Sequence, residues 1–278
     1  RELLDEALRM ASRSDIIVAA LGECAEMSGE SASRTSLEIP DAQQDLLKAL
    51  VKTGKPVVLL LFTGRPLVLN WEDANVHSIL NVWFGGSETG DAVADVLFGK
   101  ITPSGKLTTT FPRSVGQLPL FYNHLNTGRP DPDSHIFNRY ASNYLDESNE
   151  PLYPFGYGLS YTDFVYGELQ ISSETLPKNG ELTVSVTVTN KGNYDGYETV
   201  QLYLRDIYAE VARPMKELKG FERIFLKSGE SRDVKFVITK DDLKFYNSEL
   251  HYVYEPGEFD VMVGPNSRDV QTKSFQAE

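Results

Sequence analysis

The chain has 278 residues, of which 41% are hydrophobic and 11% aromatic, and its 40 acidic and 27 basic side chains give a formal net charge of −13. Because this length is about twice that of a common domain and the apolar share is that of globular proteins, we expect two folded domains and exclude a disordered chain. The acidic balance argues against nucleic acid and anionic membrane surfaces as partners, because both bind proteins through Lys and Arg.

The contents of cysteine and histidine argue against a metal centre. A single cysteine, Cys24, excludes an intrachain disulfide and any metal site built from several thiolates. The four histidines lie far apart and form no ligand motif: His77, His124, His135 and His251. We therefore expect no metal and no cofactor. No apolar run approaches the roughly 18–20 residues that a membrane-spanning helix needs, so membrane insertion is not expected either.

The first hundred residues alternate between amphipathic and continuously apolar segments. The predicted helices, which have apolar side chains at helical spacing, cover residues 1–13, 41–53 and 90–98. The predicted strands, which are apolar runs typical of buried parallel strands, cover residues 14–21, 56–62 and 77–83. Asp41 is the predicted cap of the second helix, and Gly99 is expected to end the third. This alternation with short connections predicts a three-layer α/β sandwich, in which helices cover both faces of a sheet.

Residues 101–160 are rich in proline and aromatic side chains and show weak periodicity. Loops of this length in compact domains are usually functional or disordered. The density of Tyr and Phe favours an ordered, packed segment.

From about residue 164 the pattern changes to alternation with period two. It is clearest in residues 182–188, 199–204, 232–238 and 258–263, with turn-forming residues between these segments. About six or seven short strands of this kind predict an all-β sandwich of the immunoglobulin or fibronectin type III class. We therefore expect an α/β domain over residues 1–163, including the long aromatic loop, and a β-sandwich domain over residues 164–278.

The densest cluster of polar side chains follows the first predicted strand, in residues 22–34. Ligands of open α/β sheets bind beyond the carboxyl ends of the strands, so this loop is placed for function. Glu23, Glu26 and Glu30 are candidates for general acid/base catalysis, since burial and crowding raise the pKa of a carboxyl group toward neutrality. A solvated acidic loop explains the same residues. Glycoside hydrolysis needs a defined pair of carboxylates, and the local spacing does not identify one.

Two other features have plainer interpretations. Cys24 has the position of a nucleophile, but no His or basic group is adjacent, so we interpret it as a buried structural thiol. Residues 85–90 (GGSETG) resemble a phosphate cradle, yet they lack the Lys of a P-loop and the spacing of a dinucleotide fingerprint. A tight turn from strand to helix explains them better.

Seven segments, taken together and in order, resemble glycoside hydrolase family 3. They are residues 14–40 (SDIIVAALGECAEMSGESASRTSLEIP), 52–67 (KTGKPVVLLLFTGRPL), 83–119 (WFGGSETGDAVADVLFGKITPSGKLTTTFPRSVGQLP), 122–130 (YNHLNTGRP), 152–164 (LYPFGYGLSYTDF), 213–231 (RPMKELKGFERIFLKSGES) and 256–264 (PGEFDVMVG). The resemblance covers essentially the whole chain. It implies the family's α/β-sandwich domain followed by its fibronectin type III-like domain.

The resemblance also implies a further domain. The family begins with a (β/α)₈-type barrel that carries the nucleophilic Asp in a Ser-Asp-Trp-like segment, and this chain has no Ser-Asp-Trp. The chain begins inside a helical pattern without an initiator Met. We therefore expect it to be part of a longer protein whose N-terminal barrel is missing here, and we expect the fragment alone to be inactive.

The family mechanism implies roles for four residues. Family 3 enzymes retain anomeric configuration, so one carboxylate attacks the anomeric carbon and a second acts as general acid/base. The acid/base Glu of the family lies in a loop after a strand of the second domain, which corresponds to residues 23–34. Glu30 is the first candidate, because its surroundings resemble that loop, and Glu23, directly after the strand, is the second. Arg34 is expected to pair with a loop carboxylate or to tie the loop down, and Ser31 to bind substrate or orient the loop.

The resemblance implies a retaining, exo-acting β-glucosidase. Its substrates would be β-linked oligosaccharides or aryl glucosides with a terminal non-reducing β-D-glucosyl residue, and it would need no cofactor. Similarity to the bacterial periplasmic branch predicts a periplasmic or secreted protein with its signal peptide in the missing N-terminal part. The alternative is a non-catalytic carbohydrate-binding or scaffold module, in which the loop carboxylates and aromatic side chains only bind glycan.

Overall fold

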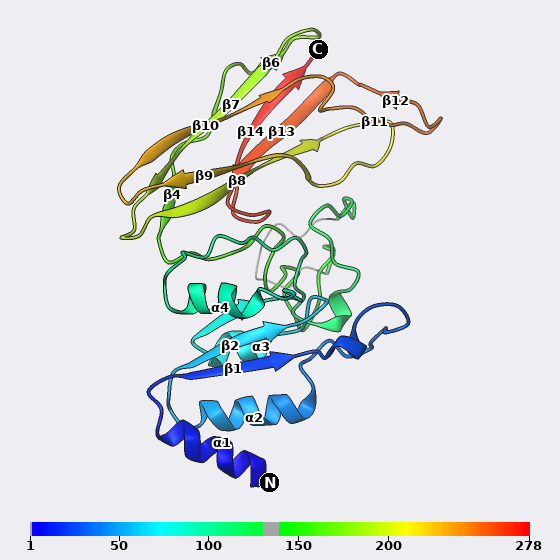
Figure 1. Ribbon diagram of the computed structural model, residues 1–278. Coiled ribbons are helices and arrows are strands. Elements are labelled where there is room, and N and C mark those ends of the chain that lie inside the picture. The colour runs from blue at the N-terminus through cyan, green and yellow to red at the C-terminus, as the bar shows by residue number, and fades with distance from the viewer. Residues whose placement is uncertain (1, 130–138) are drawn as a thin grey trace. The chain divides into compact units, whose positions relative to one another are not determined.

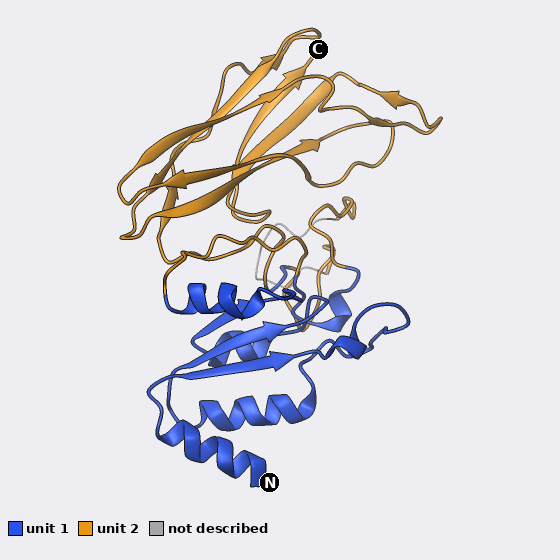
Figure 2. Ribbon diagram, in the orientation of Figure 1, with its two compact units in different colours: residues 1–98, 111–119, 150–152 blue, residues 99–110, 120–149, 153–278 orange. Residues whose placement is uncertain are grey.

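The structure, a computed structural model, describes residues 2–129 and 139–278 and divides into two compact units (Figure 2). Unit 1 consists of residues 1–98, 111–119 and 150–152, and unit 2 of residues 99–110, 120–149 and 153–278. The chain therefore passes between the units several times before residue 153. The division predicted at residue 163 rests on the change of sequence pattern and stays a prediction.

Unit 1 is built on a parallel sheet of three strands in the order β1-β2-β3. The strands are β1 (Ile17–Gly22), β2 (Val57–Phe62) and β3 (Ser78–Asn81). The helices are α1 (Glu2–Ser12), α2 (Asp41–Val51), α3 (Asn70–Asn75) and α4 (Thr89–Leu97). Figure 1 shows α2 on one side of this sheet and α4 on the other. Val57, Leu59 and Leu61 of the central strand are fully buried, as expected for a strand covered on both faces.

Two details of unit 1 differ from the prediction. The α2 helix begins at Asp41, but its cap is Pro40, whose carbonyl accepts hydrogen bonds from the backbone N–H groups of Gln43 and Gln44 at 2.8 and 3.0 Å. The short helix α3 was not predicted, because six residues without an apolar stripe carry no helical periodicity. Gly99 follows α4 with a φ of +72°, the left-handed conformation that ends helices.

Residues between α4 and the first strand of unit 2 form extended loops. In the described part of this segment we find only one short 3₁₀ helix, η2 (Val115–Gln117). Aromatic packing holds the loops of unit 2 together. The rings of Tyr122 and Phe155 stack at 4.3 Å, and those of Tyr153 and Tyr157 at 5.3 Å. Residues 130–138 of the predicted aromatic loop, with His135, lie outside the described residues.

Unit 2 is a β-sandwich of two open sheets. One sheet has the order β10-β7-β4 with β5 beside β7, the other has the order β6-β14-β13-β8-β9, and β11 pairs with β12. The strands are β4 (Phe164–Tyr166), β5 (Gln170–Ile171), β6 (Thr175–Leu176), β7 (Leu182–Asn190), β8 (Gly196–Asp206), β9 (Glu217–Leu226), β10 (Ser231–Ile238), β11 (Phe245–Tyr246), β12 (Tyr252–Val253), β13 (Gly257–Gly264) and β14 (Gln271–Ala277). The described residues thus form more strands than the six or seven predicted, because several are only two or three residues long.

The core of unit 2 comes from the alternating residues of the long strands. Alternate apolar residues of β7, such as Val184 and Val188, are fully buried, and Val200 of β8 joins them. The opposite face of β8 is covered as well, by loops of the same unit. Gln201 donates to the carbonyl of Gly156 at 3.1 Å, and the Tyr203 ring meets that of Tyr122 edge-on at 5.8 Å.

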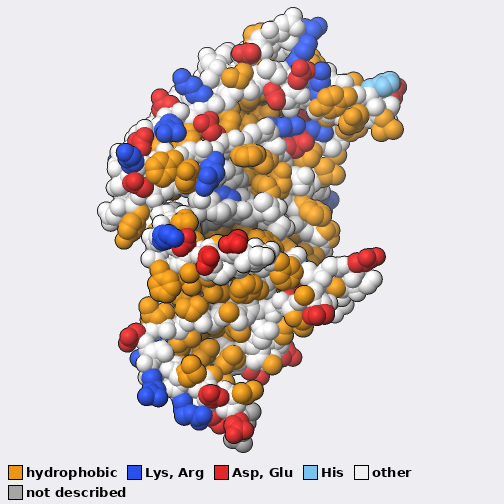
Figure 3. Space-filling model, viewed as in Figure 1, with side chains coloured by type: hydrophobic (Ala, Val, Ile, Leu, Met, Phe, Trp, Pro, Cys, Tyr) orange, Lys and Arg blue, Asp and Glu red, His pale blue; other side chains and the backbone are white. Residues whose placement is uncertain are grey.

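The predicted fold class, an α/β three-layer sandwich followed by an all-β sandwich, is confirmed. The described residues contain no helix with the length and apolar character needed to cross a membrane. On the face shown in Figure 3, Lys and Arg side chains of unit 2 are interspersed with Asp and Glu. An electrostatic footprint for nucleic acid is a clustered basic patch, and this face of unit 2 shows none in its described residues.

Candidate functional site

The polar loop of residues 23–38 leaves the carboxyl end of β1 and projects beyond the sheet (Figure 1). Its starting point is held closely against β2. Gly22 has a φ of +138°, and a Cβ at this position would lie 1.8 Å from the carbonyl oxygen of Phe62. The side chain of Gln43 bonds both backbone groups of Gly22, accepting at 2.7 Å and donating at 2.9 Å. These contacts fix the direction in which the next residue, Glu23, leaves the strand.

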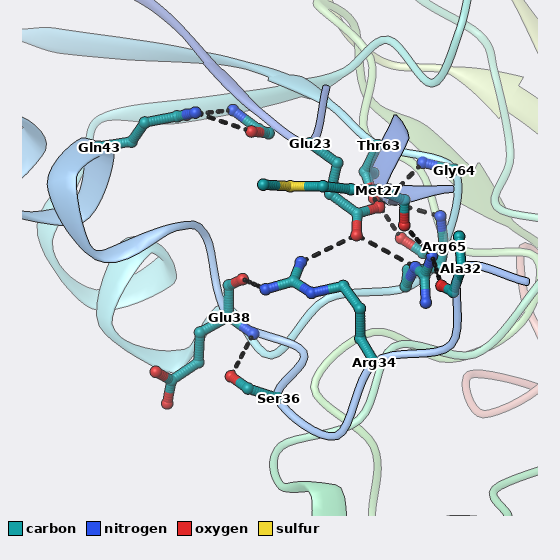
Figure 4. A network of polar contacts seen from close by, with 11 residues as sticks. Glu23, Met27, Ala32, Arg34, Ser36, Glu38, Gln43, Thr63, Gly64 and Arg65 are labelled. Atoms are coloured by element: carbon teal, nitrogen blue, oxygen red, sulfur yellow. Dashed lines mark hydrogen bonds and ion pairs between the residues drawn. The ribbon is translucent and has the colours of Figure 1, made fainter. Parts of the chain in front are cut away.

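The carboxylate of Glu23 is fully buried and bound on both oxygens (Figure 4). Its Oε1 lies 2.9 Å from Nη1 of Arg34 and 3.1 Å from Nε of Arg65. Its Oε2 accepts hydrogen bonds from Oγ1 of Thr63 at 2.9 Å and from the backbone N–H of Gly64 at 3.3 Å. Two cations and two neutral donors therefore surround one buried anion.

These contacts decide the charge of Glu23. Burial by itself raises the pKa of this carboxyl group, but the hydrogen bonds from Arg34, Thr63 and Gly64, with the charge of Arg65, outweigh it and hold the pKa below its ordinary value. Glu23 is thus an anion at neutral pH whose acceptor sites are occupied. A general acid must carry a proton and present it to the substrate, and this environment opposes both requirements.

The two arginines also tie down the loop backbone. Arg34 donates to the carbonyl of Glu38 at 3.2 Å. Arg65 donates through Nη2 to the carbonyl oxygens of Met27 and Ala32, the latter at 2.8 Å. The network in Figure 4 therefore joins the loop after β1 to the residues that directly follow β2.

The other two predicted residues lie at the tip of the loop. Glu30 and Ser31 are exposed and form part of a turn in which the N–H of Ala32 donates to the carbonyl of Gly29 at 3.3 Å. Gly29 and Ser31 have φ values of +112° and +59°. The structure therefore brings Glu23 and Arg34 together and leaves Glu30 and Ser31 facing solvent.

Thr63 and Arg65 were not predicted as site residues. The available signal was their position directly after a second apolar strand, because carboxyl ends of neighbouring parallel strands meet at one edge of a sheet. Threonine and arginine are common enough there that the sequence alone did not single them out.

The structure also tests the interpretations of Cys24 and of the glycine-rich residues 85–90. Cys24 is exposed, so its interpretation as a buried thiol was wrong: the chain has already left the sheet at Gly22. The glycine-rich residues 85–90 form a tight turn into α4, in which Oγ1 of Thr89 donates to the carbonyl of Gly86 at 2.6 Å. Among the described residues no group of three or more His, Cys, Asp or Glu side chains is placed to hold a metal ion.

Comparisons with known proteins agree with this architecture. Residues 1–161 match the glycosyl hydrolase family 3 C-terminal domain, and residues 198–267 match the fibronectin type III-like domain. The chain is 50% identical over 275 residues to a periplasmic β-glucosidase of Salmonella typhimurium, and 44% identical over 277 residues to a β-xylosidase of Formosa agariphila. In each case the match covers 99% of this chain, but only 36% and 37% of the relative.

Solved structures show the same relationship. A β-glucosidase from Listeria innocua in complex with gluconolactone is 42% identical, with a TM-score of 0.93 over 100% of this chain and 38% of that protein. The same enzyme has been solved, as a mutant, with laminaribiose at a TM-score of 0.92. The chain thus spans little more than a third of the length of these relatives. By its family match, its fold and its sequence identity, it belongs to glycoside hydrolase family 3, as that family's C-terminal α/β domain followed by a fibronectin type III-like domain.

Proposed function

We propose that this chain supplies the general acid/base residue of a retaining, exo-acting β-glucosidase, and that this residue is Glu30. The observation that carries the proposal is the contrast between two glutamates of one loop. Glu23 is buried and ionised, accepts hydrogen bonds from Arg34, Thr63 and Gly64 and forms an ion pair with Arg65, whereas Glu30 is exposed at the tip of the loop beyond β1. Only a carboxyl group in the second situation can reach a substrate and exchange protons with it.

In this proposal Glu30 acts twice. A retaining glycosidase forms a covalent glycosyl-enzyme through a nucleophilic carboxylate, while the acid/base carboxyl protonates the departing oxygen. The resulting carboxylate then removes a proton from water, which attacks the anomeric carbon and releases the nucleophile. The two carboxyl groups of such enzymes lie about 5–5.5 Å apart. The nucleophile is expected on the barrel domain that precedes this region in the family, so the chain alone is expected to be inactive.

The finer assignments follow from the relatives. Terminal β-D-glucosyl residues of β-linked oligosaccharides and aryl glucosides are the proposed substrates, supported by the β-glucosidases among the relatives and by the complex of the Listeria innocua enzyme with laminaribiose. A periplasmic or secreted location is proposed from the Salmonella typhimurium relative. Arg34 is proposed to orient the loop through Glu23, and Ser31 to support the turn that carries Glu30.

The proposal is tested in the longer enzyme that carries this chain. Glu30→Ala is expected to lower kcat/KM on cellobiose by about 10²–10⁴-fold, the usual contribution of a general acid, with a much smaller loss of kcat/KM on 2,4-dinitrophenyl β-D-glucoside, whose leaving group needs no proton. Its kcat on the activated glucoside is expected to fall as well, because Glu30 is also the base of the second step. Azide is expected to restore part of the turnover on the activated substrate.

Glu26→Ala is the matched control, because Glu26 is an exposed glutamate of the same loop. It is expected to keep the wild-type ratio of the two activities. Wild-type turnover of cellobiose by Glu30→Ala would contradict the assignment and return Glu23 to consideration. Hydrolysis of the aryl glucoside by the 278-residue chain alone would contradict the expected position of the nucleophile.

A further inference from the structure

Arg65 links the end of β2 to the loop that carries Glu30. Its Nη2 donates to two loop carbonyls, those of Met27 and Ala32, and its Nε lies 3.1 Å from Oε1 of Glu23 (Figure 4). The two carbonyls flank the four residues 28–31, so one guanidinium closes the ends of the segment that contains Glu30. The side chain is 20% exposed, so most of it is removed from solvent.

Few local hydrogen bonds hold the shape of the segment that Arg65 closes. Ser31 has a φ of +59°, a conformation that is unfavourable for a residue with a side chain. The turn has one backbone hydrogen bond of its own, from Ala32 to Gly29 at 3.3 Å, near the long limit for such bonds. A strained exposed turn persists only where its surroundings over-determine it. Arg65 supplies two hydrogen bonds that do so.

The start of the same segment rests directly on Gly64, two residues after the end of β2. A Cβ on Gly64 would lie 2.0 Å from Oγ of Ser28 and 2.9 Å from the ring of Phe84. The loop therefore packs on the backbone of the residue immediately before Arg65. Steric contact at Gly64 and hydrogen bonding by Arg65 constrain the same few residues from one side.

We propose that Arg65 is a positioning residue, which sets where the carboxyl group of Glu30 lies for proton transfer. This inference rests on the proposed function, since it assigns Arg65 a role only if Glu30 is the acid/base residue. Arg65 acts through the backbone of the loop. Misplacing a catalytic group by about 1 Å costs on the order of a hundredfold in rate, so a clamp on this backbone has a measurable kinetic effect.

Arginine suits this role better than lysine. The guanidinium presents donors in a rigid planar fork, so it can bind an anion through Nε while it binds two carbonyls through Nη2. A lysine ammonium is a point charge on a flexible stem. Arg65→Lys therefore keeps a positive charge for Glu23 and loses the rigid link between Met27 and Ala32, which separates charge balance from positioning.

The experiment compares Glu30→Ala, Arg65→Lys and the control Arg13→Lys in the longer enzyme. Arg13 is exposed and follows α1, at the opposite end of β1 from the loop. For each variant kcat and KM are measured on cellobiose and on 2,4-dinitrophenyl β-D-glucoside. Arg65→Lys is expected to lower kcat/KM on cellobiose by about ten- to a hundredfold, with a loss of kcat/KM below about threefold on the activated glucoside, because kcat/KM reports the first step and the activated leaving group needs no proton.

The ratio of the two activities separates positioning from a merely structural role. Loss of folded enzyme lowers both activities equally and leaves the ratio unchanged. If Arg65→Lys is not obtained folded, the same ratio is measured on Arg65→Gln, which is expected to change it in the same direction. A wild-type ratio in the Arg65 variant, together with the altered ratio in Glu30→Ala, would overturn this inference alone. A wild-type ratio in Glu30→Ala would overturn the proposed function and this inference with it.

Discussion

Glu23 and Glu30 are the same residue type, seven positions apart in one loop, and the structure gives them opposite environments. The partners of Glu23 are Arg34, Thr63, Gly64 and Arg65. Three of these come from about 40 residues further along the chain, so no local spacing could reveal them. Removing one partner of a buried charge is strongly destabilising, because the other charge remains in a poorly solvated site. We therefore propose that Glu23 holds the loop.

Asp206, at the end of β8, is expected to make the stability of the folded chain depend on pH. Burial raises the pKa of its carboxyl group to about 6, and the nearby charge of Glu255 adds to this against the opposing charge of Arg213. The folded pKa is thus above the ordinary value of 3.8. Below that value both the folded and the unfolded chain carry a protonated Asp206. Between pH 3.8 and about 6 the unfolded chain ionises Asp206 while the folded protein keeps it protonated, because its site is partly buried. Stability is therefore lost as the pH rises through this window.

Asp206→Asn is therefore expected to stabilise the chain at pH 7.5 by about 1 kcal/mol, after allowance for solvent screening, and to have little effect near pH 3.5. The measurement is urea unfolding at the two pH values. The control is Asp163→Asn, at an exposed carboxylate of the same unit, which is expected to leave the difference between the two pH values unchanged. Equal effects of Asp206→Asn at both pH values would refute the explanation by ionisation.

At the scale of elements, the meeting of β1 and β2 depends on one glycine. Gly22 combines a φ of +138° with a Cβ position 1.8 Å from the carbonyl oxygen of Phe62. Gly54 has a φ of +74° and nothing within 4 Å of its Cβ position. Substitutions at Gly54 and Gly22 therefore distinguish the cost of backbone strain alone from the cost of strain combined with a steric clash.

Gly54→Ala is expected to cost about 1–2 kcal/mol, the price of a left-handed conformation for a residue with a side chain. Gly22→Ala is expected to cost clearly more, above about 3 kcal/mol, because β1 and β2 must also move apart. Both values come from the midpoint of urea unfolding. Equal losses for the two variants would show that the strands accommodate the added methyl group.

Most elements were predictable from residue patterns alone. The apolar runs that became β1, β2 and β3 are continuous, and the alternation that became β7, β8, β10 and β13 is regular. The helix α3 and the two-residue strands were not predicted, because so few residues contain no period. The longer strands β9 and β14 were not named individually either. The predicted N-cap of α2 was wrong by one residue, since the cap is Pro40, which contributes its carbonyl, and not the side chain of Asp41.

At the scale of the whole molecule, unit 2 incorporates residues well before its first strand. Glu198 of β8 is 3% exposed, and its carboxylate lies 3.1 Å from Nζ of Lys106 and accepts from the hydroxyl of Tyr166 at 2.8 Å. Lys106 also donates to the carbonyl of Gly158 at 3.2 Å. A buried anion of the sandwich is thus neutralised by a lysine from the loop after α4.

Lys106→Met is expected to destabilise the chain by about 3 kcal/mol, because it leaves the buried Glu198 carboxylate without a cation. The double variant Lys106→Met/Glu198→Gln is expected to recover a large part of this loss, since the remaining amide is neutral. The free energy of unfolding is measured by heat and by urea for these two variants and for Glu198→Gln alone, which together form a double-mutant cycle. Strictly additive losses would contradict a direct coupling of the two side chains.

The sequence by itself determined the order of elements, the two fold classes and the resemblance to glycoside hydrolase family 3, because periodicity and motif order are encoded in short stretches of chain. It also pointed to the loop of residues 22–34 as the candidate place for chemistry, which stays a prediction. Only the tertiary structure showed that Glu23 is buried and Glu30 exposed, and only it showed that Thr63 and Arg65 contact Glu23. The physical reason is that burial and charge pairing depend on strands that are neighbours in a sheet but some 40 residues apart in the chain.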